Sequence, residues 1–267
     1  MRAIRDLLKK DPELLKLNAV DADIIKKRQR YERIIEDNFD KLEDIAKEAQ
    51  SLIMTLQHWR LEAGEKIFEF GKAITAEYDL NIADIDRLFS EVLPNYTRGP
   101  LLGFLISGIY HEIIQETDVL FFDLSKHVGA VSGFGFKHPR GKIEMLGNRA
   151  FFLGVKMSGG EVELRGHAGS HIGKYLQGGK IAIKGNARNW IGHHMHGGSI
   201  TIEGNAGDII GKSMTGGEIT VKGNAGGWVG DDMRKGVIRV KGECGPIDES
   251  DVRGEIFRWV AGQWKRI

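Results

Sequence analysis

The sequence contains few residues that cross-link or interrupt a fold: one cysteine, Cys244, and five prolines among 267 residues. A single cysteine excludes a disulfide within the chain and any zinc or iron–sulfur site built from clustered cysteines. The formal net charge is only +1. We therefore expect no general electrostatic attraction to nucleic acid or to an anionic membrane.

Long hydrophobic runs are also missing. The longest, from Leu101 to Tyr110, has about ten residues, whereas a membrane-spanning helix needs roughly twenty. The first residues carry charges every few positions and lack the apolar core of a secretory signal. We therefore expect a cytoplasmic protein that does not associate with membranes.

Glycine and charge are distributed unevenly. Residues 1–118 hold five of the 36 glycines and carry 17 Lys and Arg against 23 Asp and Glu. Residues 119–267 hold the other 31 glycines and carry 21 basic against 14 acidic residues. This joint shift predicts two domains, 1–118 and 119–267. The opposite charges could draw the halves together or to different partners, or could simply be two solvated surfaces.

Residues 1–118 show the periodicity of helices. Apolar residues recur at alternating steps of four and three from Ile35 to Ile74, a pattern typical of a helix packed lengthwise on another helix. We expect this stretch to be interrupted at Gly64 and Gly71, or at the pair Asp37-Asn38.

Two further helices are predicted over Asn81–Leu93 and Gly103–Glu116. The whole segment is interpreted as an α-helical bundle that binds a partner. The alternative is that its apolar seam pairs with another chain, which would make the protein self-associate through its helices.

The second half repeats every 19 residues. GSITIEGNAGDIIGKSMTG begins at residue 198, and GEITVKGNAGGWVGDDMRK follows at 217. Three glycine columns recur in each repeat, which indicates three short faces joined by tight bends. Two of these columns contain the glycines that we assign a structural role: Gly147, Gly154, Gly166, Gly173, Gly185, Gly192, Gly204, Gly211, Gly223 and Gly230.

Between the bends, β-branched residues alternate with polar ones, as in Ile200-Thr201-Ile202. Period-2 alternation predicts strands with one face in a core, and stacking the repeats gives a parallel β-helix with 19-residue coils. The Asn column from Asn148 to Asn224 should stack along one edge. The coil before Gly141 looks degenerate, and the tail FRWVAGQWKRI is expected either to cap the open end or to dock on the helical half.

Two other repeat folds fit less well. A leucine-rich repeat needs room for a helix or similar element, which 19 glycine-rich residues do not provide. A left-handed hexapeptide helix needs an aliphatic residue inside each corner, yet Arg165 and Lys184 precede the corners at Gly166 and Gly185.

The phrases GNAGDIIGKSMTGGEITVKGNAGGWVG and GNARNWIGHHMHGGSITIEGNA resemble the GXGXG β-helix family over roughly residues 130–254. This family includes the C-terminal domain of the glutamate synthase large subunit and a short, separate subunit of formylmethanofuran dehydrogenase. The resemblance implies a right-handed β-helix that acts as a scaffold between catalytic domains or subunits. It also implies that molybdenum or tungsten, flavin or iron–sulfur cofactors are bound elsewhere in the complex, and none by this chain.

Few residues suggest chemistry of their own. The sequence shows no set of catalytic or cofactor-binding residues. His194 and His196 are weak candidates for a metal site because they could lie on one side of a coil. The neighbours His193 and His194 should point to opposite faces of a strand, so they are not expected to share a metal. Phe152, Trp190 and Trp228 share one column with His171. If this column faces outward it is a candidate subunit interface, and if it faces inward it is core.

Three functions remain open from the sequence. The first is a non-catalytic scaffold subunit of a multisubunit redox enzyme, which the resemblance favours. The second is a stand-alone enzyme, either an acyltransferase or hydrolase or a polysaccharide-acting β-helix, although such enzymes usually carry long loops. The third is a protein that assembles through open β-helix ends.

Overall fold

The structure is a computed structural model and describes residues 40–51, 61–93, 101–126, 130–247 and 252–267. The chain divides into two compact units after Glu43. The structure describes residues 40–43 of the first unit, and the helices and strands from α3 to β11 all belong to the second. The helical stripe before residue 40 and the predicted break at Asp37-Asn38 lie outside the described residues.

The helical region of this unit begins with the helix end at residues 44–51. It continues with α3 (Leu61–Tyr78), α4 (Ile82–Arg87), the π-helix η1 (Leu88–Val92) and α6 (Leu102–Tyr110). Asn81 caps α4: its side chain accepts hydrogen bonds from the amides of Ala83 and Asp84, and the Asp84 carboxylate accepts one from the Asn81 amide. The helix predicted over 81–93 is therefore confirmed, with a π-helical second half. The helix predicted over 103–116 ends earlier, at Tyr110, and continues as turns.

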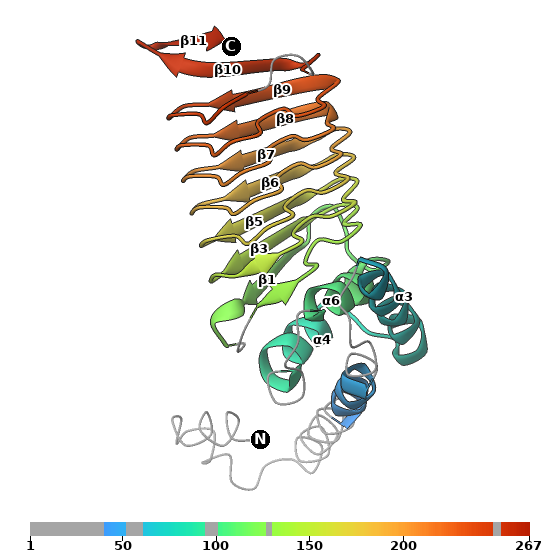
Figure 1. The fold of residues 1–267 in the computed structure, drawn as a ribbon. Coiled ribbons are helices and arrows are strands. Elements are labelled where there is room, and N and C mark those ends of the chain that lie inside the picture. Colours follow the sequence, from blue (N-terminus) through green and yellow to red (C-terminus); the bar gives the residue numbers. More distant parts are fainter. Residues whose placement is uncertain (1–39, 52–60, 94–100, 127–129, 248–251) are drawn as a thin grey trace, which may run out of the picture. The chain divides into compact units, whose positions relative to one another are not determined.

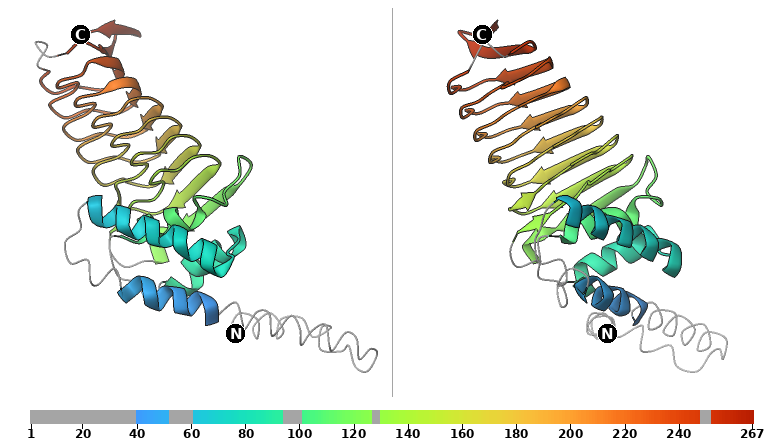
Figure 2. Two further views of the ribbon diagram at one scale, coloured as in Figure 1. Left: turned by 90° about the vertical axis from the view of Figure 1, so that its right-hand side faces the viewer. Right: turned by 45° about the vertical axis from the view of Figure 1, so that its right-hand side comes forward.

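The expected breaks at Gly64 and Gly71 are wrong, because α3 runs unbroken through both residues. These glycines instead allow close packing on α6, which lies beside α3 in Figures 1 and 2. A methyl group at Gly71 would come within 2.5 Å of the Leu105 carbonyl oxygen. The Thr75 hydroxyl also donates to the Ile109 carbonyl at 2.6 Å. No helix in the described ranges has the length and apolar character needed to cross a bilayer.

The second half is a parallel β-helix, as predicted, and Figure 1 shows its coils stacked one on another. One sheet contains nine strands in the order β1-β3-β5-β6-β7-β8-β9-β10-β11, and β2 and β4 form a small second sheet. From β3 to β9 the paired residues are 19 positions apart, as in Ile143 with Val162, except at the start of β8, where Thr215 pairs with Lys235 across a register shift. The right-handed winding of the coils, which the family resemblance implies, stays a prediction.

The strands are β1 (Val119–Asp123), β2 (Val131–Ser132), β3 (Lys142–Leu146), β4 (Ala150–Phe151), β5 (Glu161–Arg165), β6 (Lys180–Ile183), β7 (Ser199–Ile202), β8 (Thr215–Val221), β9 (Lys235–Val240), β10 (Glu255–Val260) and β11 (Gln263–Arg266).

Successive coils bury the same columns of apolar side chains. The column from Ile143 to Ile238 and the one from Met145 to Val240 are at most 1% exposed. Because no coil can cover its own apolar face, each depends on the coils above and below it for stability.

The predicted glycine corners are present, and they work in two ways. Gly173 has a φ of +63°, and a side chain there would also meet Ile200 at 2.5 Å. Gly185 has an ordinary φ, but a Cβ would lie 2.5 Å from the Gly166 carbonyl oxygen of the coil before. The first kind of glycine makes the bend, and the second lets the coils approach closely.

The predicted asparagine column is also present, but its bonds differ from the expected amide stack. Each side chain accepts a hydrogen bond from a backbone amide one coil later, as Asn186 does from Asn205 at 2.8 Å. The same bond recurs from Asn148 at 2.7 Å to Asn224 at 2.8 Å, with His167 using its Nδ1. The column therefore connects successive coils rather than pairing amides.

Both ends of the β-helix are more complete than the sequence indicates. The coil before Gly141 contributes strand β1, in which Leu120 and Phe122 extend the two core columns by pairing with Ile143 and Met145. At the other end, β10 continues the parallel stack and β11 folds back on it as an antiparallel hairpin. The tail thus caps the open end, the first of its two predicted positions.

The helices and the first coils share one core within this unit. Phe122 and Phe134 lie against Phe89 with ring centroids 4.8 and 5.6 Å away, and Phe136 lies 5.1 Å from Phe68 of α3. The change from helix to strand comes at Val119, and the division of the chain into two domains there stays a prediction.

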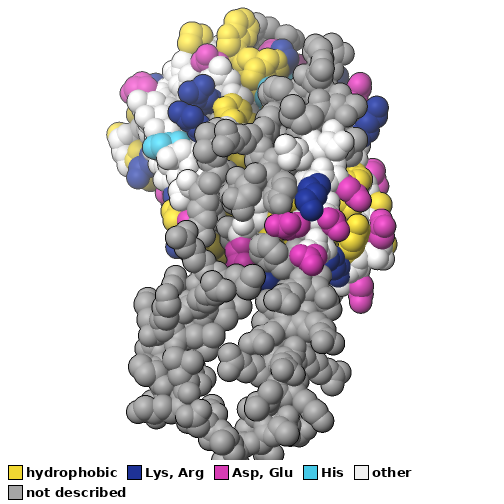
Figure 3. Space-filling model, turned by 90° about the horizontal axis from the view of Figure 1, so that it is seen from below, with side chains coloured by type: hydrophobic (Ala, Val, Ile, Leu, Met, Phe, Trp, Pro, Cys, Tyr) yellow, Lys and Arg dark blue, Asp and Glu magenta, His cyan; other side chains and the backbone are white. Residues whose placement is uncertain are grey.

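Ion pairs also join α3 to the first coils. Lys137 pairs with Glu69 at 3.3 Å, and Lys156 pairs with Glu65. Figure 3 views the molecule from the helical side and shows acidic side chains gathered on the visible part of this face. Some of the basic residues of the second half therefore form ion pairs with acidic residues of the first half within the same chain.

Candidate functional site: a ladder of histidine and aromatic rings

One corner of the coils carries side chains on strained backbone. Its residues have a φ of about +60°, which costs about 1–2 kcal/mol for a residue with a Cβ. The two columns concerned are Phe152, His171, Trp190, Ile209 and Trp228, and Lys156, Tyr175, His194, Ser213 and Asp232. The repeat pattern predicted positive φ at the glycines alone and gave no sign of it at these residues.

Hydrogen bonds between coils hold this conformation. The amide of His171 donates to the Asn189 carbonyl at 3.1 Å, and the amide of Trp190 donates to the Asp208 carbonyl at 3.0 Å. The equivalent bond from Tyr175 goes to His193 at 2.9 Å. Because every coil repeats the bond, the side chains of the corner project from nearly identical backbone and stack in register.

The rings form a continuous series, which we call the ladder: Phe152, His171, Trp190, His193, His194 and Tyr175. The centroids of His171 lie 4.5 Å from Phe152 and 5.7 Å from Trp190, with nearly parallel planes. Tyr175 and His194 lie 5.2 Å apart with an angle of 3° between their rings. His193 joins the two stacks, 5.0 Å from Trp190 and 4.1 Å from His194.

The ladder histidines are held in their neutral form. Burial lowers the pKa of His193 to about 4, with the nearby His194 and Lys174 adding to the effect. Burial and then Lys174 also lower the pKa of His171 and of His194. The Nδ1 atoms of His171 and His193 are buried without a hydrogen-bond partner in the structure. Near neutral pH the ladder is therefore an uncharged aromatic surface.

Lys174, at the edge of the ladder, also has a lowered pKa. Burial and the neighbouring Lys156 lower the pKa of Lys174. Its ammonium group lies 5.1 Å from the centroid of the Tyr175 ring. This cation–π contact partly replaces the water that the ammonium loses.

The structure decides the orientation of the predicted aromatic column, which the sequence left open. Phe152 is buried, Trp190 is half-buried, and Trp228 is 60% exposed. The column thus runs from core to surface along the β-helix. Ile209 stands between Trp190 and Trp228, so Trp228 lies outside the ladder, beside a pocket of about 390 Å³ that Pro246 and Ile247 also line.

The predicted histidines lie in different surroundings. His194 is stacked in the ladder, whereas the Nδ1 of His196 lies 2.7 Å from the Thr215 hydroxyl. The expectation that His193 and His194 point to opposite faces is wrong, because the two residues lie in a turn rather than a strand and their rings touch. In the described ranges no three His, Cys, Asp or Glu side chains lie close enough together to hold a metal ion. A metal role for His194 and His196 stays a prediction.

The ladder also contains Tyr175, which the sequence did not single out, and His193, which the sequence placed on the face opposite to His194. A signal for Tyr175 exists, since it stands 19 residues before His194 and so occupies the same column. The contact of His193 with the ladder rings has no such signal, because it depends on the positive φ of the neighbouring His194.

Comparison with known proteins does not name a family for this chain: no family model and no curated protein matches it.

Proposed function

We propose that this chain is a non-catalytic scaffold subunit of a multisubunit redox enzyme, similar to the GXGXG subunit of formylmethanofuran dehydrogenase or to the GXGXG domain of glutamate synthase. The observation that carries the proposal is the ladder, an uncharged aromatic surface along a regular β-helix. Aromatic side chains are enriched at protein interfaces, where rigid rings bury much apolar area. The ladder and the exposed Trp228 beside it form the proposed docking face for the catalytic subunits.

The regular coils support a scaffold rather than an enzyme. Enzymes built on rigid repeats usually place their active sites in long loops. Between β3 and β9 the paired residues keep the 19-residue spacing apart from a register shift between Thr215 and Glu218, so no long loop interrupts the coils there. The Ser213 hydroxyl donates to Asp232 at 2.9 Å, not to a ladder histidine. This arrangement does not activate a serine nucleophile for the alternative function, an acyltransferase or hydrolase.

The proposal assigns the cofactors to other subunits. Molybdenum or tungsten, flavin or iron–sulfur centres would lie in the partner chains, and this chain would bind none of them. The site of assembly would be the cytoplasm. Residues 1–118 would hold a further subunit or pair with a second copy of the chain.

The test is purification of the tagged chain from its native host under gentle conditions, followed by mass spectrometry and metal analysis. We expect redox subunits and their metals in fixed stoichiometry. Trp190→Ala should release them, whereas Arg188→Ala, an exposed change two residues away, should not. Changing His194 and His196 together to alanine removes one ring of the docking face but no catalytic group, so the complex that stays assembled should keep its activity within about twofold of the wild type.

Two results would contradict the proposal. One is a chain that elutes alone and free of metal. The other is a large loss of activity in the double histidine variant while the complex stays assembled. Hydrolase activity of the isolated chain towards acyl esters would then favour the alternative.

A further inference from the structure

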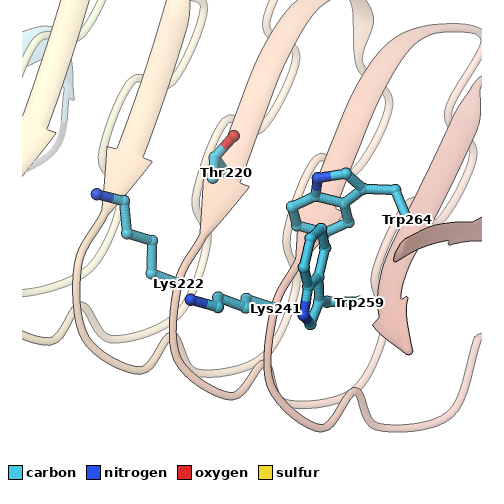
Figure 4. A pocket seen from close by; sticks show the side chains of 5 residues that line it. All are labelled: Thr220, Lys222, Lys241, Trp259 and Trp264. Atoms are coloured by element: carbon cyan, nitrogen blue, oxygen red, sulfur yellow. The ribbon is translucent and has the colours of Figure 1, made fainter. Parts of the chain in front are cut away.

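A second aromatic surface lies at the capped end of the β-helix, on the outer face of the large sheet. Trp259 of β10 and Trp264 of β11 are directly opposite each other in the hairpin. Their ring centroids are 5.2 Å apart at an angle of 74°, and each residue is 37% exposed. Together with Thr220, Lys222 and Lys241 they line a pocket of about 300 Å³, which Figure 4 shows.

The coil register explains why these residues meet. Val221 pairs with Val240, and Val240 pairs with Arg258. The next residues in the three coils, Lys222, Lys241 and Trp259, therefore follow one another in a single column on the outer face. Adjacent parallel strands are about 4.8 Å apart, so the two lysines stand side by side with the tryptophan pair beyond them.

The polar groups of this pocket are mainly donors. Each lysine presents an ammonium group, and each indole presents one N–H. Lys222 pairs with Glu203 at 2.7 Å. Within the part of the chain that the structure describes, the ammonium group of Lys241 has no ion pair or hydrogen bond, and neither indole N–H has an acceptor. The unpaired ammonium group and the two N–H groups favour a negatively charged ligand that is rich in acceptors, and the partly exposed indole rings favour one that is flat.

We propose that this pocket binds a small anion made of a planar ring and a phosphate, the chemistry of a mononucleotide. The ring stacks on the exposed tryptophan faces, and the phosphate accepts hydrogen bonds from the unpaired ammonium group of Lys241, while Lys222 stays paired with Glu203. Bases stack on aromatic side chains whatever their sequence, and lysine is a common phosphate-binding residue. The volume lies at the lower end of small-molecule sites, which suits one nucleotide rather than a polymer. The inference does not depend on the scaffold function.

Calorimetry of the full chain with AMP, adenosine, inorganic phosphate and glucuronate separates the contributions of ring and charge. We expect AMP to bind at least about tenfold more tightly than adenosine or phosphate, because only AMP uses both halves of the pocket. Added salt should weaken AMP binding. Glucuronate binding as tight as that of AMP would overturn the assignment of a planar ring.

Variants test the residues. Lys241→Ala should weaken AMP binding about tenfold, since it removes a charged donor. Lys184→Ala, in the same column three coils before Lys241 and outside the pocket, should leave it unchanged. Trp264→Ala should abolish the preference for AMP over phosphate. The indole N–H resonances of Trp259 and Trp264 should shift on AMP addition while that of Trp190 stays fixed. Equal AMP affinity in the wild type and in Lys241→Ala would overturn the proposal.

Discussion

His138 shows at the scale of one residue how burial sets a charge. It is fully buried next to Tyr110, its Nε2 lies 3.3 Å from the Gly141 carbonyl oxygen, and its Nδ1 has no partner in the structure. Burial lowers its pKa to about 4. A second proton would place a charge and an unpaired N–H in the core, where neither is solvated.

The first prediction concerns pH. In the unfolded chain the pKa of His138 returns to about 6.5, so below that pH the unfolded state binds a proton that the folded state refuses. Stability should therefore fall between pH 6.5 and pH 4, by up to about 3 kcal/mol from this residue. Urea unfolding at a series of pH values would measure the fall. His138→Gln, which keeps a donor for Gly141 but does not titrate, should show a shallower dependence; superimposable pH profiles would refute this role.

The second prediction concerns the inner face of the coils. Ile200→Asp would bury an unpaired carboxylate in a position that is 0% exposed, so we expect a loss of about 4 kcal/mol or more, or no folded protein. Thr201→Asp, the adjacent residue on the outer face, is the matched control and should cost less than about 1 kcal/mol. Thermal unfolding compares the two variants. Similar melting temperatures would show that Ile200 does not face the core.

At the scale of elements, the crossing of α3 and α6 depends on glycines that the sequence alone suggested were breaks. Gly71 faces the backbone of α6 at Leu105 and Ile109, and Gly108 faces α3 in return. Glycine weakens a helix by about 1 kcal/mol relative to alanine. Glycine is nevertheless found at both positions because the backbones of α3 and α6 come too close there for any larger residue.

The third prediction follows from this contact. Gly71→Ala should lower the melting temperature although alanine is the better helix former, because the added methyl group would lie 2.5 Å from the Leu105 carbonyl oxygen. Ala76→Leu on the exposed side of the same helix should leave it nearly unchanged. Circular dichroism melts of both variants provide the comparison. A more stable Gly71→Ala protein would show that propensity outweighs packing at this crossing.

The elements also show what a repeat reveals and what it hides. The 19-residue period predicted the coils, the core columns and the glycine corners, because each repeated position has the same surroundings. It did not predict β1, whose Leu120 and Phe122 precede the period, nor the positive φ of Trp190 and His194. A side chain that does not recur in other repeats, such as His193, takes its position from contacts in the folded structure. The spacing of the repeat cannot predict those contacts.

At the scale of the whole molecule, a β-helix has a general weakness: its last coil offers unpaired backbone groups to any other strand. Here β11 pairs with β10 on the side where a further coil would stack. Strand β11 is itself exposed along its length and carries Lys265 and Arg266. Charged side chains on a short edge strand discourage further pairing.

The last prediction tests this cap. Removing residues 261–267 would free the edge of β10 and expose the apolar end of the stack, including Ile256, which is 1% exposed in the intact chain. We expect the shortened protein to associate end to end, with a mass that rises with concentration in light scattering. Trp264→Ala keeps the hairpin backbone and should keep the mass of the intact chain, which separates the loss of strand pairing from the loss of a tryptophan. A shortened chain that scatters like the intact one at every concentration would mean that β10 protects its own edge, and that β11 serves the two-tryptophan pocket alone.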